Sequence, residues 1–177
     1  MSQPKKLEIK GKYIVIGIVA LVVIIGITAF LNMNGNQTGK DGMSFTVTQD
    51  EKQVATFSIE EIKKMPSVKF HEKIVSSDKG DTQGDYIGVP ISYILNKADE
   101  QLLKKNDKFI FVAGDGFAAA AKGRELDKKE NVILVYAMDG KNLEPFKDGG
   151  QGPMRLIIRS DTYGNRSVRF LSGVECK

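Results

Sequence analysis

The sequence predicts an α+β domain, rich in short strands with two or three small helices, behind one N-terminal transmembrane helix. Residues 13–31 carry no charge, and nineteen helical residues rise about 28 Å, close to the ~30 Å hydrocarbon core of a bilayer. From residue 43 onward, short β-branched and aromatic runs alternate with Gly- and Asp-containing turns, which is typical of strands. Two short segments carry helix-start signals instead.

The apolar stretch is predicted to be an uncleaved anchor. Residues 1–12 hold four lysines against one acid, Glu8, and the more basic flank of a span stays inside, so we expect a cytoplasmic stub at 1–12. A cleaved signal peptide has a shorter apolar region and a small-residue cleavage site, and this stretch shows neither. Residues 32–42 are predicted to be a flexible linker. Residues 43–177 are then an extracytoplasmic domain of the cell membrane, with membrane lipid as the partner of the helix.

Charge and composition narrow the classes of partner and site. Five of the 26 basic and two of the 22 acidic residues precede residue 43, which leaves the domain with a net charge of +1. A nucleic-acid-binding domain is normally basic, so we expect no nucleic-acid partner. Cys176 is the only cysteine and His71 the only histidine. An intrachain disulfide and a zinc-type site are therefore excluded.

The first part of the domain predicts a hairpin, a helix and a strand. Residues 45–48 and 54–57 are strand-like and flank a polar turn at 49–51. Ser58 and Glu61 have the spacing of a capping box, and Pro66 is expected to end that helix. Residues 68–75 follow as a strand, and residues 76–84 as a polar loop.

The middle of the domain predicts a short helix between strands. Pro90 stands at a helix start, before an apolar stripe of Ile91, Ile94 and Leu95. Residues 109–113 predict a buried strand, and residues 132–138, the most apolar run of the domain, predict a central one. Asp139 and Gly140 predict a turn after it.

The stretch 149–175 combines a Gly-rich approach with four arginines. Residues 155–160 and 168–170 predict two strands around a polar turn at 161–166. One interpretation is a Gly/Pro loop feeding a hairpin with solvated arginines. The other is an anion site, because an arginine fork suits carboxylate, phosphate or sulfate. The arginines concerned are Arg155, Arg159, Arg166 and Arg169.

Three motifs in order resemble the sulfite-oxidase-like molybdopterin-binding domain. They are Tyr86-Ile-Gly-Val-Pro-Ile, then Phe109-Ile-Phe-Val-Ala-Gly-Asp-Gly-Phe with Val135-Tyr-Ala-Met-Asp-Gly, and finally Gly-Pro-Met-Arg-Leu-Ile-Ile with Tyr-Gly-Asn-Arg-Ser-Val-Arg-Phe-Leu (152–158 and 163–171). The match spans about residues 55–175. The resemblance implies a mixed, strand-rich fold and molybdopterin as the cofactor.

The same resemblance places a cofactor site and raises a question about activity. It puts Arg166, Ser167 and Arg169 at the phosphate end of the pterin, and Ser76 or Ser77 where the family has the cysteine that ligates molybdenum. A serine hydroxyl is a harder and less acidic ligand than a thiolate. We therefore expect a ligand-binding or electron-transfer accessory module without molybdenum oxidase activity, with a redox or membrane-protein partner. The alternatives are an active molybdopterin-dependent oxidoreductase and a structural interaction domain of a membrane complex.

Overall fold

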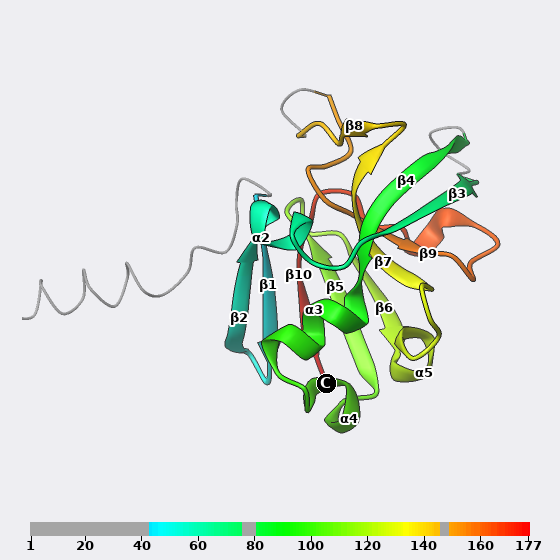
Figure 1. The fold of residues 1–177 in the computed structure, drawn as a ribbon. Helices are drawn as coiled ribbons and strands as arrows, with labels where there is room; N and C mark the ends of the chain where they lie inside the picture. The colour runs from blue at the N-terminus through cyan, green and yellow to red at the C-terminus, as the bar shows by residue number, and fades with distance from the viewer. Residues whose placement is uncertain (1–42, 76–80, 146–148) are drawn as a thin grey trace, which may run out of the picture. The chain divides into compact units, whose positions relative to one another are not determined.

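Two five-stranded sheets make up the described part of the chain (Figure 1). The computed structural model describes residues 43–75, 81–145 and 149–177. The predicted span at 13–31, its flanks at 1–12 and 32–42, and both Ser76 and Ser77 lie outside the described residues. Within the described ranges, no helix has the length and apolar character needed to cross a membrane.

The first sheet, sheet A, has the order β2-β1-β10-β5-β6. The hairpin predicted at the start of the domain is confirmed, and its turn residues Asp50 and Glu51 both have positive φ. β10 inserts between β1 and β5, parallel to β1 and antiparallel to β5. The chain's last strand therefore completes the sheet that its first strands begin. The bounds are β1 Ser44–Gln49, β2 Lys52–Ser58, β5 Lys108–Ala113, β6 Ala118–Lys122 and β10 Leu171–Cys176.

The second sheet, sheet B, is antiparallel, with the order β3-β4-β7-β8 and with β9 also paired to β7. β7 is the predicted central strand: six of its seven residues are buried, and it pairs with β4 as well as with β8 and β9. Both faces of sheet B carry apolar side chains, which is why the sequence of β7 is a continuous apolar run. The bounds are β3 Val68–Ile74, β4 Thr82–Pro90, β7 Val132–Met138, β8 Lys141–Asn142 and β9 Arg155–Ile158.

Short helices link the strands. The predicted capping box of α2 is present: the Glu61 amide donates to Ser58 Oγ at 3.3 Å, and the Ser58 amide donates to the Glu61 carboxylate at 2.8 Å. Pro90 is the N-cap residue of α3, as predicted. The helical bounds are α2 Ile59–Lys63, α3 Ile91–Ala98, α4 Leu102–Lys105, α5 Gly123–Leu126 and the 3-10 turn η2 Gly164–Arg166.

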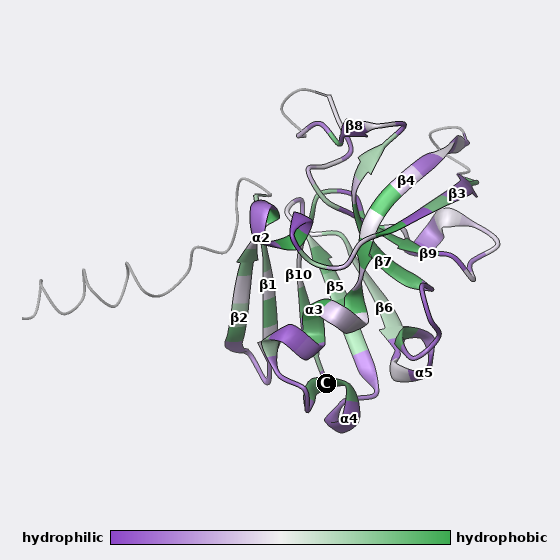
Figure 2. Cartoon of the chain, viewed as in Figure 1, coloured by the Kyte–Doolittle hydropathy of each residue, from purple (hydrophilic) through white to green (hydrophobic). Residues whose placement is uncertain are grey.

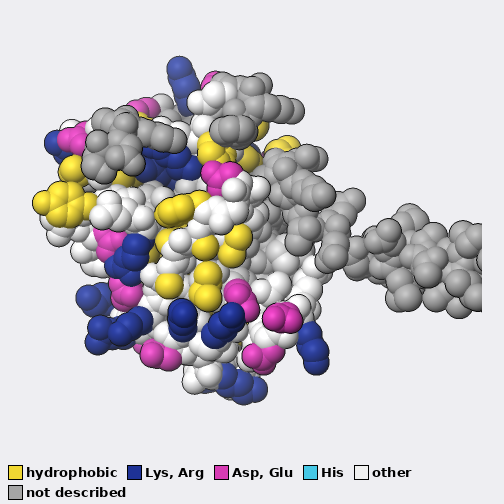
Figure 3. Space-filling model, turned by 180° about the vertical axis from the view of Figure 1, so that it is seen from behind, with side chains coloured by type: hydrophobic (Ala, Val, Ile, Leu, Met, Phe, Trp, Pro, Cys, Tyr) yellow, Lys and Arg dark blue, Asp and Glu magenta, His cyan; other side chains and the backbone are white. Residues whose placement is uncertain are grey.

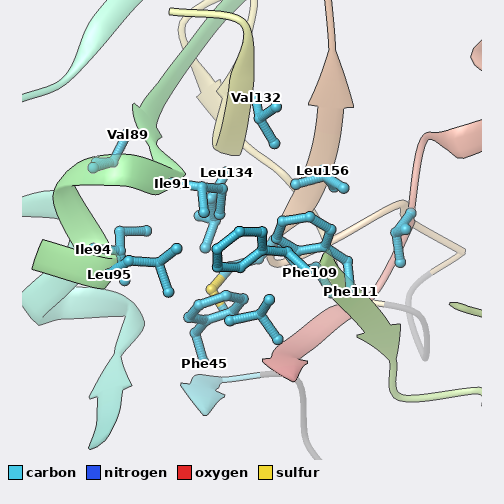
Figure 4. Close-up of a cluster of buried hydrophobic side chains, with 14 of the residues drawn as sticks. Phe45, Val89, Ile91, Ile94, Leu95, Phe109, Phe111, Val132, Leu134 and Leu156 are labelled. Atoms are coloured by element: carbon cyan, nitrogen blue, oxygen red, sulfur yellow. The ribbon is translucent and has the colours of Figure 1, made fainter. Parts of the chain in front are cut away.

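The main core lies between the two sheets and under α3. Phe45, Phe109 and Phe111 of sheet A meet Leu134 and Leu156 of sheet B, and the apolar stripe of α3 closes the side (Figure 4). A second, smaller cluster covers the other face of sheet B. The free end of β4 is hydrophilic (Figure 2). The second cluster comprises Phe70, Ile74, Tyr86, Ile133, Val135 and Ile157.

Two element predictions were wrong. The expected strand at 168–170 is absent, because Phe170 has a φ of 53° and turns the chain; Val168 makes only an isolated bridge to Leu156. Residues 82–84 belong to β4 rather than to a polar loop. The α2 helix ends at Lys63, so Pro66 lies outside it, as expected. The strand β6 was not predicted, since a run of four alanines favours helix by propensity.

Candidate functional site

Arg155 is a buried cation without a carboxylate partner among the described residues. It opens β9, where all four residues are buried, and it is 3% exposed. Its Nε donates to Ser167 Oγ at 2.9 Å, and its Nη1 donates to Gln151 Oε1. No ion pair of the described residues includes it. Its positive charge is thus hydrogen-bonded in part but not neutralised.

The lowered pKa of Arg155 shows that burying its charge is energetically unfavourable. Burial lowers the pKa of its guanidinium most, Tyr86 raises it and the nearby charge of Arg169 lowers it, and together they bring it to about 10. A displacement of that size from the usual 12.5 corresponds to about 3 kcal/mol against the charged form. Since the charged form still dominates at neutral pH, the folded protein carries this cost, and a bound anion would offset it.

Tyr86 places an unpartnered hydroxyl in the same region. It lies in the middle of β4, is 0% exposed and stacks on Phe70 with ring centroids 5.7 Å apart. Its hydroxyl is the buried side-chain polar atom that finds no hydrogen-bond partner among the described residues. Burial raises the pKa of the phenol, while the charge of Arg155 opposes that rise. A buried hydroxyl without a partner is unfavourable by about 1–3 kcal/mol, so a ligand acceptor there would be stabilising.

Arg169 is brought to this site by the unusual backbone of Phe170. The Phe170 amide donates to Gln151 O at 3.3 Å, and the Leu171 amide donates to Met154 O at 2.9 Å. These bonds hold the chain after Arg169 against the 151–154 segment. Arg169 is half-buried, and its charge acts on both Arg155 and Tyr86. A left-handed conformation in a bulky residue is strained and is a recurrent feature of functional sites.

The structure divides the predicted site residues between two places. Ser167 lies in the site: it accepts from Arg155 and donates to Leu156 O at 2.9 Å. Arg169 is close by, as described above. Arg166 instead lies beside α5, where its guanidinium binds Glu125 at 2.9 Å and also Asp161. Ser76 and Ser77 lie outside the described residues.

Arg166 forms a complete ion-pair network of its own. Hydrogen bonds to Glu125 and Asp161 raise its pKa above the usual value, and Arg166 in turn lowers the pKa of Glu125. Its Nη1 also donates to Ala120 O at 3.2 Å. These contacts tie the 161–166 turn to α5 and β6, a structural task that its residue type alone did not reveal.

Sequence reasoning named Arg155 only as one of four arginines of a possible anion site, and it did not select Tyr86. The signal for Arg155 was an arginine inside the otherwise apolar run 154–158, since an unneutralised arginine is almost never fully buried. For Tyr86 the sequence held no signal, because a tyrosine in a strand is ordinary until its hydroxyl proves to be unpartnered.

The side chains gathered around Arg155 suit an anion. They offer a guanidinium, a phenol and a second arginine, all donors. Among the described residues no group of three or more His, Cys, Asp or Glu could hold a metal ion. Cys176 lies in the main core, separated from Tyr86 by sheet B, and burial raises the pKa of its thiol to about 11.

Comparison with known proteins agrees with the fold. Residues 33–177 match the family described as the oxidoreductase molybdopterin binding domain. The sulfane dehydrogenase SoxCD from Paracoccus pantotrophus has a similar structure, with a TM-score of 0.58 and 17% identity over 77% of this chain and 38% of that one. The chain therefore spans well under half the length of that relative. No curated protein matches. On the evidence of the family match, which covers most of its length, this chain belongs to the oxidoreductase molybdopterin-binding domain family.

Proposed function

We propose that this chain is a membrane-anchored, extracytoplasmic binding module of the molybdopterin-binding fold, without molybdenum oxidase activity. It takes an anionic ligand between Tyr86, Arg155 and Arg169, with Ser167 orienting Arg155. The observation that carries the proposal is the burial of Arg155 with no carboxylate partner among the described residues. A structural arginine would be paired, as Arg166 is.

The residues present fit the phosphate-bearing part of a molybdopterin. Arg155 and Arg169 would hold its phosphate oxygens, and the Tyr86 hydroxyl would donate a further hydrogen bond. When bound, this cofactor carries molybdenum on its dithiolene and supplies two-electron redox chemistry. The chain's own contribution is to bind and orient the anion in a site from which burial excludes most water.

The described residues do not fit a molybdenum centre that needs a protein thiolate. Soft thiolate ligands are preferred by such metals, and the sole cysteine, Cys176, lies in the main core with a raised thiol pKa. The family resemblance places Ser76 or Ser77 at the position of the ligand. A serine hydroxyl there supports binding without oxidase activity.

The sequence supports the location of the module. Nineteen uncharged residues follow a lysine-rich stub, and this asymmetry favours a domain outside the cytoplasm that is tethered to membrane lipid. A redox or membrane protein in the same bilayer is the expected partner.

Metal and pterin analysis tests the proposal. The full chain is purified in detergent from a host that makes molybdopterin, and its molybdenum, pterin and tightly bound phosphate are quantified per chain. We expect phosphate or a phosphate-bearing pterin with far less than one molybdenum per chain. One molybdenum per chain together with reducible absorbance would establish an active oxidoreductase instead.

A further inference from the structure

Three lysines lie side by side on the outer face of sheet A, the face directed away from the main core. Lys108 and Lys177 exchange two backbone hydrogen bonds of 2.9 Å, and Lys108 is also the register partner of Lys122. All three side chains are exposed. Like charges directly opposite each other in a sheet are destabilising by roughly 0.2–1 kcal/mol. We call this set the lysine row.

Two members of the lysine row are uncompensated. Lys177 pairs with Glu175 at 2.9 Å, whereas no carboxylate of the described residues forms an ion pair with Lys108 or Lys122. The row therefore presents a local positive charge on a domain whose overall charge is nearly balanced.

A hollow of about 290 Å³ adjoins the lysine row. Lys108, Lys122 and Arg166 line it together with Asp107 and Glu125. Arg166 binds both Glu125, at 2.9 Å, and Asp161, so this ion-pair group adds no positive charge to the hollow. Apart from that group, the lining charges are Lys108, Lys122 and Asp107, and the two lysines are the groups that an incoming carboxylate would meet.

The strand beside the hollow, β6, is an edge of sheet A with unused backbone groups. Phe117 O faces β5, where it accepts from the Ala113 amide at 2.8 Å, so the polar groups of Ala118 and Ala120 face outward. Arg166 covers the carbonyl of Ala120. The amide and carbonyl of Ala118 and the amide of Ala120 remain available at the edge, and the small alanine side chains allow a close approach.

An apolar patch joins the edge strand to the lysine row. Its members are half-buried on β5, exposed on β6 and paired across the two strands. Figure 3 shows hydrophobic side chains gathered on this face, with Lys and Arg side chains, and Asp and Glu between them, along its lower margin. The aliphatic side chains of the patch and the cations of the lysine row would contact the apolar and the acidic side chains of an amphipathic partner. The patch comprises Ile110, Val112, Ala118 and Ala120.

We propose that β6, the apolar patch and the lysine row form a docking surface for an extended acidic segment of a partner protein. The segment pairs with the edge at Ala118 and Ala120, lays apolar side chains on the patch, and sets carboxylates beside Lys108 and Lys122. Strand addition supplies main-chain hydrogen bonds, and alternate side chains supply the selectivity. Free amides and a free carbonyl along one strand edge favour an extended polypeptide over a lipid surface or a nucleic acid, because a polypeptide backbone both donates and accepts at the same spacing.

Binding of short synthetic peptides to the full chain in detergent, measured by fluorescence anisotropy, tests this surface. The probes alternate valine and threonine and carry two aspartates at one end or the other, and the control probes carry two lysines instead. We expect an aspartate probe to bind about 10-fold or more tightly than its lysine counterpart. The double change Lys108→Glu and Lys122→Glu should reverse that order. The matched control, Lys128→Glu with Lys129→Glu, alters two exposed lysines outside the row and should leave it unchanged.

A backbone variant tests strand addition separately. Ala120→Pro removes an amide that faces away from β5, so it should abolish peptide binding while the domain stays folded. Equal binding of the two kinds of probe, no binding of either, or indifference to the Lys108/Lys122 reversal would overturn the proposal. Retention of anionic vesicles that depends on the lysine row, without peptide binding, would overturn it too. Arg155 lies on sheet B, so phosphate binding there can be measured separately from peptide binding to the docking surface on sheet A.

Discussion

Replacement of Arg155 by methionine separates a ligand-binding arginine from a structural one. Methionine keeps much of the volume of the side chain and removes the buried charge. The charged form of Arg155 is disfavoured by about 3 kcal/mol, judged from its pKa of about 10. The substitution also removes the hydrogen bonds to Ser167 and Gln151, each of which is a net contribution of about 1 kcal/mol. Ser167 keeps its bond to Leu156 O, so it is not stranded.

The balance favours the variant in the absence of anions. We expect Arg155→Met to leave the free energy of unfolding unchanged or to raise it by about 1 kcal/mol, which raises the melting temperature by roughly 3 °C for a domain of this size. Thermal unfolding of the full chain in phosphate-free detergent buffer, followed by near-ultraviolet circular dichroism, measures this. Arg159→Met is the matched control: Arg159 pairs with Glu72 at 3.3 Å and covers Phe70, so its loss should destabilise slightly.

One result would refute the reasoning. If Arg155→Met lowers the free energy of unfolding by more than about 2 kcal/mol, the guanidinium is stabilising as it stands. Arg155 would then be a structural residue with compensation that the described contacts do not show, and the anion site would lose its main support.

Further predictions address the remaining groups. Tyr86→Phe should raise stability without ligand by about 1 kcal/mol, since it removes an unpartnered buried hydroxyl, and should weaken phosphate binding; calorimetry checks both. Arg166→Ala should lower the free energy of unfolding by about 2–3 kcal/mol, because it leaves two carboxylates without their cation, and should leave phosphate affinity unchanged. A loss of phosphate affinity would show that Arg166 belongs to the anion site. Because the pKa of Glu125 is lowered in the folded protein, its ionised carboxylate stabilises the fold at pH values above its usual pKa of 4.5, and this stabilisation is lost as the pH falls. Acid titration of Glu125→Gln should therefore show a smaller drop than the wild type. Protease added to intact spheroplasts should cleave beyond residue 43, and protection there would reverse the topology.

Local signals in the sequence sufficed for most elements of the fold. The capping box at Ser58 and Glu61 and the apolar run of β7 act through neighbours in the chain, so pattern and propensity identify them. The last strand was misplaced because its position depends on Phe170, whose left-handed backbone is fixed by bonds to Gln151 and Gly114. No propensity scale anticipates a phenylalanine in that conformation.

The candidate site was only half predictable, for a related reason. Ser167 and Arg169 entered through a family resemblance, and the structure brings both to Arg155. Arg166 is adjacent in sequence but lies with Glu125, forty-one residues away in the chain. Which arginine meets a carboxylate and which remains without one is decided by tertiary contacts, and these are absent from residue type and spacing.

Calorimetric titration of inorganic phosphate into the full chain in detergent tests the central claim, an anion site at Arg155, most directly. The account predicts one saturable site with a dissociation constant on the order of 0.1–1 mM, weakened about 10-fold or more by Arg155→Met and unchanged by Arg159→Met. Absence of saturable binding, or equal affinity in the wild type and Arg155→Met, would contradict it.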